Sequence, residues 1–334
     1  MSVEDIISPV YLVGGSVRDT LLGKEPKDYD YCTPVLPDDI ERLVKESGHR
    51  AFVTGKRFGT IGFNLEGKFI EITTFRSETY GETRKPDVEF VSSIQQDLSR
   101  RDFTINAIAK RGKRYIDPFG GRIDLEKRII RAVGNPTQRF KEDPLRMLRA
   151  VRFVAQLGFE IDPDTFKSIQ KNAHSILSVS KERWIQEIDR LLMSEYVYDG
   201  LGILFESGLM KFVLPELQIQ YMYDQNSDYH ALTLAEHTMK TVEQSPKELN
   251  TRWAALLHDV GKPFVRTDNR RGSSNYIFHD TVGAELVYGI GKRLKWSNER
   301  LKEVQDLVKN HLSDESPIRE ADNFSKQGDP LQSK

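Results

Sequence analysis

The chain of 334 residues has a single cysteine, Cys32, so no disulfide can form within it. Such sparse cysteine is typical of proteins that fold in a reducing compartment, and we expect a cytoplasmic protein. The sequence has no apolar run of about 18 residues, which a membrane-spanning helix would need. The N-terminal residues MSVEDIISPV lack the basic segment of a secretory signal. These absences argue against a secreted or membrane-embedded protein.

The sequence also lacks an overall excess of charge, since 49 Lys and Arg residues face 50 Asp and Glu residues. The charge is unevenly spread, however. Between Arg100 and Arg152 there are 15 basic residues against 6 acidic ones. A basic block within a neutral chain favours a polyanionic substrate held in one place, although a solvated charged surface is the alternative.

The pattern of apolar residues predicts an α+β protein of several domains. Residues 1–140 alternate short apolar runs with turns, which is typical of a mixed sheet with a few helices. Residues 141–223 and, after a polar linker, residues 229–315 have helical spacing. The polar residues 316–334 are expected to be a disordered tail.

The most informative run is YLVGGSVRDTLLGKEPKDYDY, residues 11–31. It predicts a short strand, a turn at Gly14 and Gly15, a short helix and a second strand that includes Asp28 and Asp30. Residues two apart on a strand face the same side, so the two carboxylates are expected to project together. Paired carboxylates hold Mg²⁺ for phosphoryl transfer, and a Gly-rich turn that opens a helix holds phosphates. An ordinary surface loop is the alternative.

The segment Lys68–Arg76, KFIEITTFR, alternates like a strand and places Glu71 opposite its apolar neighbours. Glu71 is therefore a candidate third carboxylate of the metal site, or else a solvent-facing residue of a half-buried strand. The following residues, Arg76–Val91, are rich in Gly, Pro and charge, and predict a mobile loop.

Asp143, Arg146, Arg149 and Arg152 recur every three residues in EDPLRMLRAVRF, and predict a stripe along one helix. The stripe could be a row of ion pairs of small energetic value. It could also read a base, because a carboxylate accepts from an exocyclic amine and a guanidinium donates to a ring nitrogen. Cytosine and adenine both present an amine next to an acceptor nitrogen, whereas uracil and guanine present a carbonyl and an N–H. Asp143 with Arg146 would thus admit C and A without a template.

Four of the seven histidines and one aspartate fall on successive predicted helices, within TLAEHTMK, LLHDVGKP, FHDTVGAE and VKNHLSD. Neutral imidazoles and a carboxylate suit a divalent transition metal inside a helical bundle. A lone buried histidine would usually be structural, but this pattern favours a metal site. The candidate ligands are His237, His258, Asp259, His279 and His311.

The stretches GGSVRD, LLG, DYD, RRDFTINA and EDPLR resemble the motifs of the nucleotidyltransferase superfamily, and more narrowly the bacterial CCA-adding enzyme and poly(A) polymerase family. HDVGK resembles the signature of the HD phosphohydrolase superfamily. For the closing aspartate that this resemblance implies, Asp314 is a weak candidate. The resemblance implies a polymerase-β-like head, an all-helical neck and an HD-type helical domain. It also implies addition of C and A to the 3′ end of tRNA from CTP and ATP, without a template. The loop after Arg76 matches one that the family needs for adding the terminal A.

The resemblance implies a role for each motif residue. Asp28 and Asp30, with Glu71 as a possible third carboxylate, would be catalytic and hold Mg²⁺, while the HD ligands would hold a metal such as Ni²⁺ or Mn²⁺. Asp102 and Asn106 would be structural. The nucleotide-binding residues would be Gly15, Arg18, Arg101, Asp143, Arg146, Arg149 and Arg152.

Other functions stay open at this point. An enzyme that adds only A, or a poly(A) polymerase, would share the head motifs. An HD phosphohydrolase that repairs RNA 3′ ends could use the head for binding alone. A non-catalytic RNA-binding protein would not need the carboxylate pair.

Overall fold

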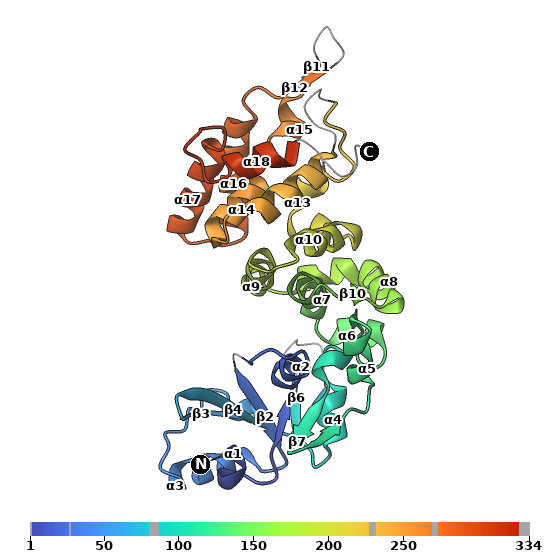
Figure 1. Cartoon of the computed structure of the whole chain (residues 1–334), viewed down its shortest axis with the longest axis vertical. Helices are drawn as coiled ribbons and strands as arrows, with labels where there is room; N and C mark the ends of the chain where they lie inside the picture. The colour runs from blue at the N-terminus through green and yellow to red at the C-terminus, as the bar shows by residue number, and fades with distance from the viewer. Residues whose placement is uncertain (1, 27, 80–86, 227–231, 269–272, 327–334) are drawn as a thin grey trace. The chain divides into compact units, whose positions relative to one another are not determined.

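The computed structural model describes residues 2–26, 28–79, 87–226, 232–268 and 273–326 (Figure 1). These form two compact units. The first comprises Met1–Asp143 and Glu160–Thr165, and the second comprises Pro144–Phe159 and Phe166–Lys334. None of the described helices is long and apolar enough to cross a membrane.

The first unit is built on a six-stranded mixed sheet in the order β3-β4-β2-β1-β7-β8. Strands β2 and β4 are parallel, and every other pair in this sheet is antiparallel. Figure 1 shows β2 and β4 beside each other in the head. The strands are β1 (Tyr11–Val13), β2 (Tyr29–Thr33), β3 (Thr60–Leu65), β4 (Lys68–Thr74), β7 (Ala109–Arg111) and β8 (Arg114–Ile116). The mixed-sheet head is therefore confirmed.

Short helices cover this sheet, and apolar side chains beneath them form its core. Ile40 and Val44 of α3 pack with Ile61, Phe63 and other strand residues. Two-stranded pairs complete the unit: β5 (Arg76–Thr79) with β6 (Asp87–Phe90), and β9 (Ile129–Ile130) with β10 (Glu160–Ile161). The helices are α1 (Val3–Ile6), α2 (Gly15–Leu21), α3 (Pro37–Glu46), α4 (Ile94–Ser99), α5 (Gly121–Glu126) and α6 (Pro136–Glu142).

The prediction of a mobile loop over Arg76–Val91 is wrong at both ends, because β5 and β6 pair there as an antiparallel hairpin. Residues 80–86 between them lie outside the described part. β-Branched and aromatic residues such as Thr79, Val88 and Phe90 favour strands in spite of the surrounding charge.

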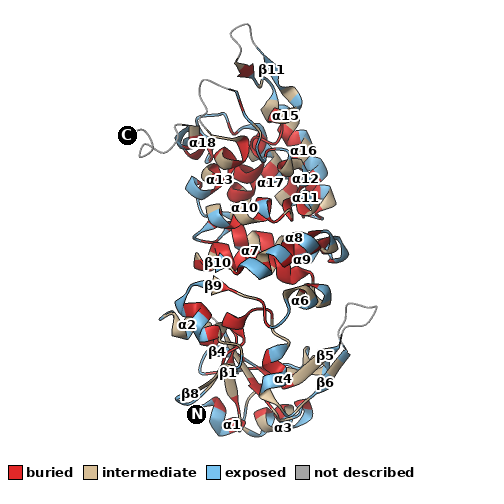
Figure 2. Ribbon diagram, turned by 90° about the vertical axis from the view of Figure 1, so that its right-hand side faces the viewer, coloured by how far each residue is buried: buried red, intermediate tan, exposed pale blue. Residues whose placement is uncertain are grey.

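The second unit is helical, with a small β11 (Thr267–Asp268) and β12 (Ser274–Asn275) pair. Figure 2 shows buried residues along α7, α13 and α17. Gly200 of α10 lets this helix approach α7, because a Cβ there would lie 2.6 Å from the Cβ of Ala155. The helices are α7 (Leu145–Leu157), α8 (Pro163–Asn172, begun in the first unit), α9 (Lys181–Leu192), α10 (Val197–Glu206), α11 (Met210–Val213), α12 (Pro215–Gln218), α13 (Leu234–Gln244), α14 (Leu249–Leu257), α15 (Lys262–Val265), α16 (His279–Arg293), α17 (Asn298–Lys309) and α18 (Arg319–Lys326).

The tail predicted to be disordered from residue 316 is in part a helix, so that prediction is wrong for α18. Ala321, Asp322 and Ser325 of α18 are buried, and Ser325 Oγ lies 2.9 Å from Thr241 Oγ of α13. The buried face of α18 consists of small and polar residues, so no large apolar side chain marks this face in the sequence. Residues 327–334 lie outside the described part.

Candidate functional site

The turn between β1 and α2 requires glycine at its first position. Gly14 has φ 68° and ψ −137°, a conformation that residues with a Cβ rarely adopt. A Cβ on Gly14 would also lie 2.9 Å from Nη1 of Arg101 and 4.0 Å from Oδ2 of Asp30. The glycine turn, Arg101 and Asp30 therefore meet at one place in the head.

The predicted carboxylates lie next to this turn. Asp30 is the second residue of β2, and Asp28 precedes that strand. The parallel pairing of β2 with β4 places Asp30 directly opposite Glu71. Ser16 joins α2 to this segment: its Oγ donates to the carbonyl of Asp28 (2.9 Å) and accepts from the N–H of Asp30 (3.0 Å). The sequence reasoning missed Ser16, although its place after the glycine pair was a signal.

The three carboxylates act on one another electrostatically. Burial and the charge of Asp28 raise the pKa of Asp30, against the opposing effect of Arg101. Burial and the charges of Asp30 and Asp28 raise the pKa of Glu71. The carboxylate oxygens of Asp28, Asp30 and Glu71 do not all lie within 4.8 Å of one another. Oxygen ligands whose charges repel one another fit a hard divalent cation such as Mg²⁺.

Arg18 is held beside this site by side chains of the RRDFTINA motif. Its Nη1 donates to Oδ1 of Asn106 (2.8 Å), and its Nη2 pairs with Asp19 (2.7 Å). Asn106 in turn donates from Nδ2 to Asp102 (3.1 Å), which also accepts from the N–H of Phe103. Asp102 and Asn106 thus have the structural role expected of them, and Asn106 also orients Arg18.

Arg101 is held by Asp97, a fully buried carboxylate that the sequence reasoning missed. Asp97 accepts from Nη2 of Arg100 (2.8 Å) and from Nη2 of Arg101 (3.3 Å). Burial alone would raise the pKa of Asp97, but the charges of Arg101 and Arg100 outweigh it, and the pKa is lowered. Asp97 therefore fixes the guanidinium that lies against Gly14.

We expect Asp97→Asn to destabilise the head by about 2 kcal/mol, because it removes the charge that two largely buried arginines share. Urea denaturation measures this, with Asp38→Asn, an exposed carboxylate, as the control. The folded-state pKa of Asp97 is lowered, so its contribution is full above the unfolded pKa of about 3.9 and is lost as the pH falls. Equal midpoints for Asp97→Asn and the wild type would contradict this role.

The proposed four-residue stripe does not lie on one helix. Asp143 ends α6 with an extended backbone (φ −140°, ψ 100°), and α7 begins after Pro144. The residue before a proline avoids helical backbone, which explains the break. Arg146, Arg149 and Arg152 do lie on α7, so the stripe is confirmed for the arginines alone.

Two of these arginines face a glutamate of α9 that the sequence reasoning missed. Nε of Arg152 lies 2.6 Å from Oε2 of Glu187, and Nη1 of Arg149 lies 3.9 Å from its Oε1. Arg152 and Glu187 are buried, and the guanidinium of Arg152 also lies 4.2 Å from the centre of the Phe153 ring. This ion pair fixes α7 against α9.

The predicted histidines and Asp259 meet inside the second unit, as two groups of ligand atoms within 4.8 Å of one another. Asp259 lies between the groups. Its Oδ2 is 3.2 Å from Nε2 of His237 and 3.1 Å from Nε2 of His258, and its Oδ1 is 3.3 Å from Nε2 of His279. The groups are His237, His258 and Asp322, and Asp259, His279 and His311.

A close approach of two segments brings the groups together. A Cβ on Gly261, in the HDVGK motif, would lie 2.2 Å from the carbonyl oxygen of His279 and 2.8 Å from the nitrogen of Gly283. Only glycine therefore allows Asp259 to reach α16. Gly261 of the HDVGK motif is thus required for steric reasons, which the sequence alone did not reveal.

The closing carboxylate is Asp322 and not Asp314, so the weak assignment of Asp314 is wrong. Asp314 is fully exposed, whereas Oδ1 of Asp322 lies 3.2 Å from Nε2 of His237 and the residue is buried. Asp322 was missed because α18 was expected to be disordered.

Each imidazole is oriented by a partner at Nδ1. Carbonyl oxygens only accept, so Nδ1 beside them carries the proton and Nε2 presents a lone pair to the centre of the cluster. Such second partners commonly orient metal-binding histidines. The Nδ1 partners are the carbonyls of Ala255 for His258 (2.8 Å), Tyr276 for His279 (2.6 Å) and Val308 for His311 (2.7 Å), and the hydroxyl of Ser325 for His237 (2.9 Å).

The buried charges in this cluster shift the pKa values of its own side chains. Burial and the charge of His258 lower the pKa of His311 to about 4, so that this imidazole is neutral near pH 7. Burial would raise the pKa of Asp259, but His258 and Lys262 outweigh it and hold the pKa well below its usual range. The charges of Asp259 and Asp322 outweigh burial and raise the pKa of His258, so this imidazole would lose its proton when a divalent ion binds. Ionised carboxylates beside imidazoles fit such an ion.

The carboxylates of the head and the histidine cluster fall within regions that match models of known protein families. Residues 10–131 match the family model described as the poly A polymerase head domain, residues 158–220 the probable RNA and SrmB-binding site of polymerase A, and residues 228–330 the HD domain. The CCA-adding enzyme of Geobacillus thermodenitrificans is 38% identical over 301 residues, which are 87% of this chain and 69% of the relative. The chain belongs to the CCA-adding enzyme family.

Two further relatives agree with this assignment. The CCA-adding enzyme of Geobacillus stearothermophilus is 40% identical over 300 residues, 87% of this chain and 69% of that enzyme. The crystal structure of the Bacillus stearothermophilus CCA-adding enzyme in complex with CTP aligns with a TM-score of 0.63 and 34% identity, over 93% of this chain and 73% of that one. The resemblance to the CCA-adding family and the α+β fold are thus confirmed, and the family implies a divalent metal ion.

Proposed function

We propose that this protein adds C and A nucleotides to the 3′ end of tRNA without a template, using CTP and ATP. The observation that carries the proposal is the placement of Asp30, beside Gly14 and Arg101 and in register with Glu71. The two curated relatives described above are CCA-adding enzymes, which favours this function over a poly(A) polymerase. A tRNA substrate is consistent with action in the cytoplasm.

The chain's own residues would bind, orient and neutralise the reactants. Asp28 and Asp30, with Glu71 beside them, would hold Mg²⁺. When bound, these ions activate the attacking 3′-OH and stabilise the leaving pyrophosphate. The main-chain N–H groups that begin α2 at Gly15 and the guanidinium groups of Arg18 and Arg101 would take the negative charge of the triphosphate.

We assign selection of C and A to Asp143 and Arg146, and binding of the nucleotide's phosphates to Arg149 and Arg152. The helix α7 supports the arginines on one rigid element. The ion pair of Arg152 with Glu187 orients this guanidinium, and a bound triphosphate would compete with Glu187 for it.

The test is incubation with tRNA that lacks CCA, with CTP and ATP singly and together. We expect two C residues from CTP alone and a complete CCA from both nucleotides. Long tails from ATP alone would favour a poly(A) polymerase, and extension of only CC-ended tRNA would indicate an A-adding enzyme.

We infer a second activity for the HD cluster, hydrolysis of phosphate esters at RNA 3′ ends, with Mn²⁺ or Ni²⁺ as the metal. Six ligand side chains in two groups support it, since a carboxylate between two groups suits a pair of metal ions about 3.5–4 Å apart. When bound, such ions activate water for attack on phosphorus. His237, His258 and Asp322 would hold one ion, and Asp259, His279 and His311 the other.

Metal analysis tests this arrangement. We expect two divalent ions per chain after loading with Mn²⁺, and about one in His311→Ala, because this change removes a ligand from one group only. His174→Ala, outside the cluster, is the control. Elemental analysis of the full chain after desalting gives the count. A single ion in the wild type would rule out the paired site and leave a site of one metal.

A further inference from the structure

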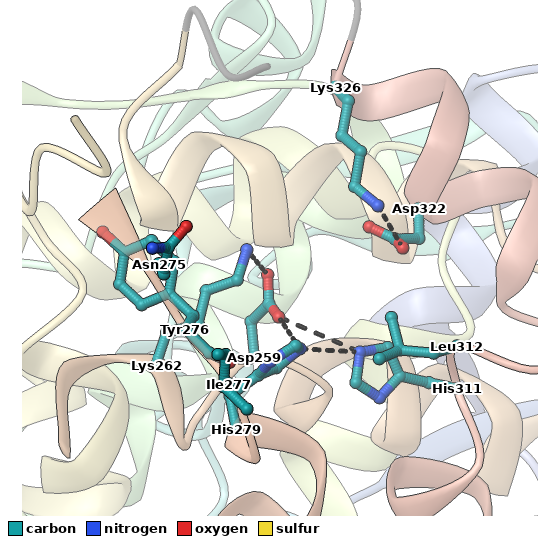
Figure 3. Close-up of a pocket in the computed structure, with 10 residues that line it drawn as sticks. All are labelled: Asp259, Lys262, Asn275, Tyr276, Ile277, His279, His311, Leu312, Asp322 and Lys326. Atoms are coloured by element: carbon teal, nitrogen blue, oxygen red, sulfur yellow. Dashed lines mark hydrogen bonds and ion pairs between the residues drawn. The ribbon is translucent and has the colours of Figure 1, made fainter. Parts of the chain in front are cut away.

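The metal ligands of the HD cluster form one wall of a pocket of about 270 Å³. Figure 3 shows two lysines reaching into the same space, Lys262 from α15 and Lys326 from α18. Tyr276, Ile277 and Leu312 line the rest of the pocket together with Asn275. The CCA-adding reaction assigned to the head uses none of these side chains.

Each lysine pairs with one of the two carboxylate ligands. Nζ of Lys262 lies 2.7 Å from Oδ2 of Asp259 and donates to Oε1 of Gln225 (2.9 Å). Nζ of Lys326 lies 2.7 Å from Oδ2 of Asp322, whose other oxygen is directed at His237. Lys262 is buried, and the side chain of Lys326 is 25% exposed. Two ammonium groups thus stand directly beside the proposed metal ligands.

The charge of this pocket follows from its residues. Two carboxylates are balanced by two lysines, and a neutral imidazole adds no charge. Every divalent ion that binds therefore adds positive charge that the lining side chains do not compensate. Like charges at such short distances are costly in a partly buried site, so metal loading favours binding of an anion.

We propose that Lys262 and Lys326 form a phosphate-binding subsite beside the metals, selective for the dianion of a terminal phosphate monoester. This inference rests on the metal site of the proposed HD activity. A phosphate monoester carries nearly two negative charges at neutral pH, whereas a cyclic or linear diester carries one. A dianion therefore compensates the excess charge better. Its oxygens accept from the ammonium groups, which would turn from the carboxylates to the phosphate.

The pocket also limits what is attached to the phosphate. Its volume is below that of pockets that enclose a whole drug-sized ligand, so it would take the phosphate and part of a sugar. Tyr276, Ile277 and Leu312 offer apolar surface next to the polar wall. Ile277 is 65% exposed and Leu312 is 42% exposed, which leaves them accessible to a nucleoside. A phosphate at the end of a nucleotide chain matches this combination.

The experiment measures binding of inorganic phosphate to the Mn²⁺-loaded full chain by isothermal titration calorimetry. We expect Lys326→Ala to raise the Kd of phosphate about tenfold or more, because a charge-assisted hydrogen bond is lost. Lys326→Arg restores most of the affinity. Lys302→Ala, an exposed lysine on α17, leaves it unchanged. Lys262→Met provides a second variant at the other ammonium group.

Two further measurements belong to this test: the metal content of each lysine variant, and the affinities for a 2′,3′-cyclic phosphate and a 3′-phosphate. Unchanged phosphate affinity in both lysine variants, with full metal content, would overturn the proposal and leave the lysines as counter-charges of Asp259 and Asp322. A 2′,3′-cyclic phosphate that binds as tightly as a 3′-phosphate would overturn the preference for a dianion. Lysine-dependent phosphate binding without any hydrolysis of either ester would instead refute the HD activity and leave this subsite standing.

Discussion

Asp28→Ala and Asp30→Ala are each expected to lower the rate of nucleotide addition about 1000-fold or more. Metal ions supply several kcal/mol of transition-state stabilisation in phosphoryl transfer, and each 1.36 kcal/mol is a factor of ten. Asp30 lies against Gly14 and opposite Glu71, and Asp28 acts on the pKa of both carboxylates. The loss should appear in kcat for both CTP and ATP, because one site serves both nucleotides.

A matched control lies three residues before Asp28. Glu25 has a side chain that is 84% exposed and pairs weakly with Lys68 at 3.8 Å. Glu25→Ala should therefore retain addition. The two aspartate variants should also retain the metal content of the HD cluster, which shows that they are folded. Nearly normal addition by Asp28→Ala and Asp30→Ala would remove the head from the reaction and leave the HD phosphohydrolase as the main activity.

Asp143→Ala and Arg146→Ala are expected to relax the choice of base by about 10–100-fold each. In the wild type, uracil or guanine would set a carbonyl against Asp143 and an N–H against Arg146, at a cost of about 1–3 kcal/mol for each mismatched group. Removing either side chain removes one of these penalties. The ratio of kcat/KM for UTP to that for CTP should rise, because UTP is freed of one penalty and CTP loses one hydrogen bond.

Single-nucleotide incorporation with each of the four triphosphates measures this ratio. Lys141→Ala is the control, since Lys141 is an exposed cation on α6, two residues before Asp143. A uniform fall for all four nucleotides, with the ratio unchanged, would show that Asp143 and Arg146 support the fold or the phosphates and do not read the base.

The head could be predicted from short-range patterns. A strand, a glycine turn and a helix follow one another in residues 11–21. The strand predicted to include both aspartates begins after Asp28, so it carries Asp30 alone. Glu71 was assigned correctly to a strand, but its place opposite Asp30 depends on the parallel pairing of β2 with β4. Pairing between strands about 40 residues apart leaves no mark on local periodicity.

The two errors in the candidate sites have different causes. The helix predicted through Asp143 ignored Pro144, whose effect on the preceding residue can be read from sequence. The missing ligand Asp322 could not be read in this way, because α18 buries only small and polar side chains. Its helix is held by contacts such as Ser325 with Thr241 and His237.

The order of residues was enough to establish a nucleotidyltransferase head, a row of arginines on a helix and a set of histidines suited to metal. Those features depend on residue type and on spacing within a single helix or strand. The backbone geometry of that element fixes the face on which each side chain lies. Folding in three dimensions settled which groups meet: Glu187 with Arg152, and Asp322 with His237. Each pair joins different elements, and the burial of its charges makes the partner necessary.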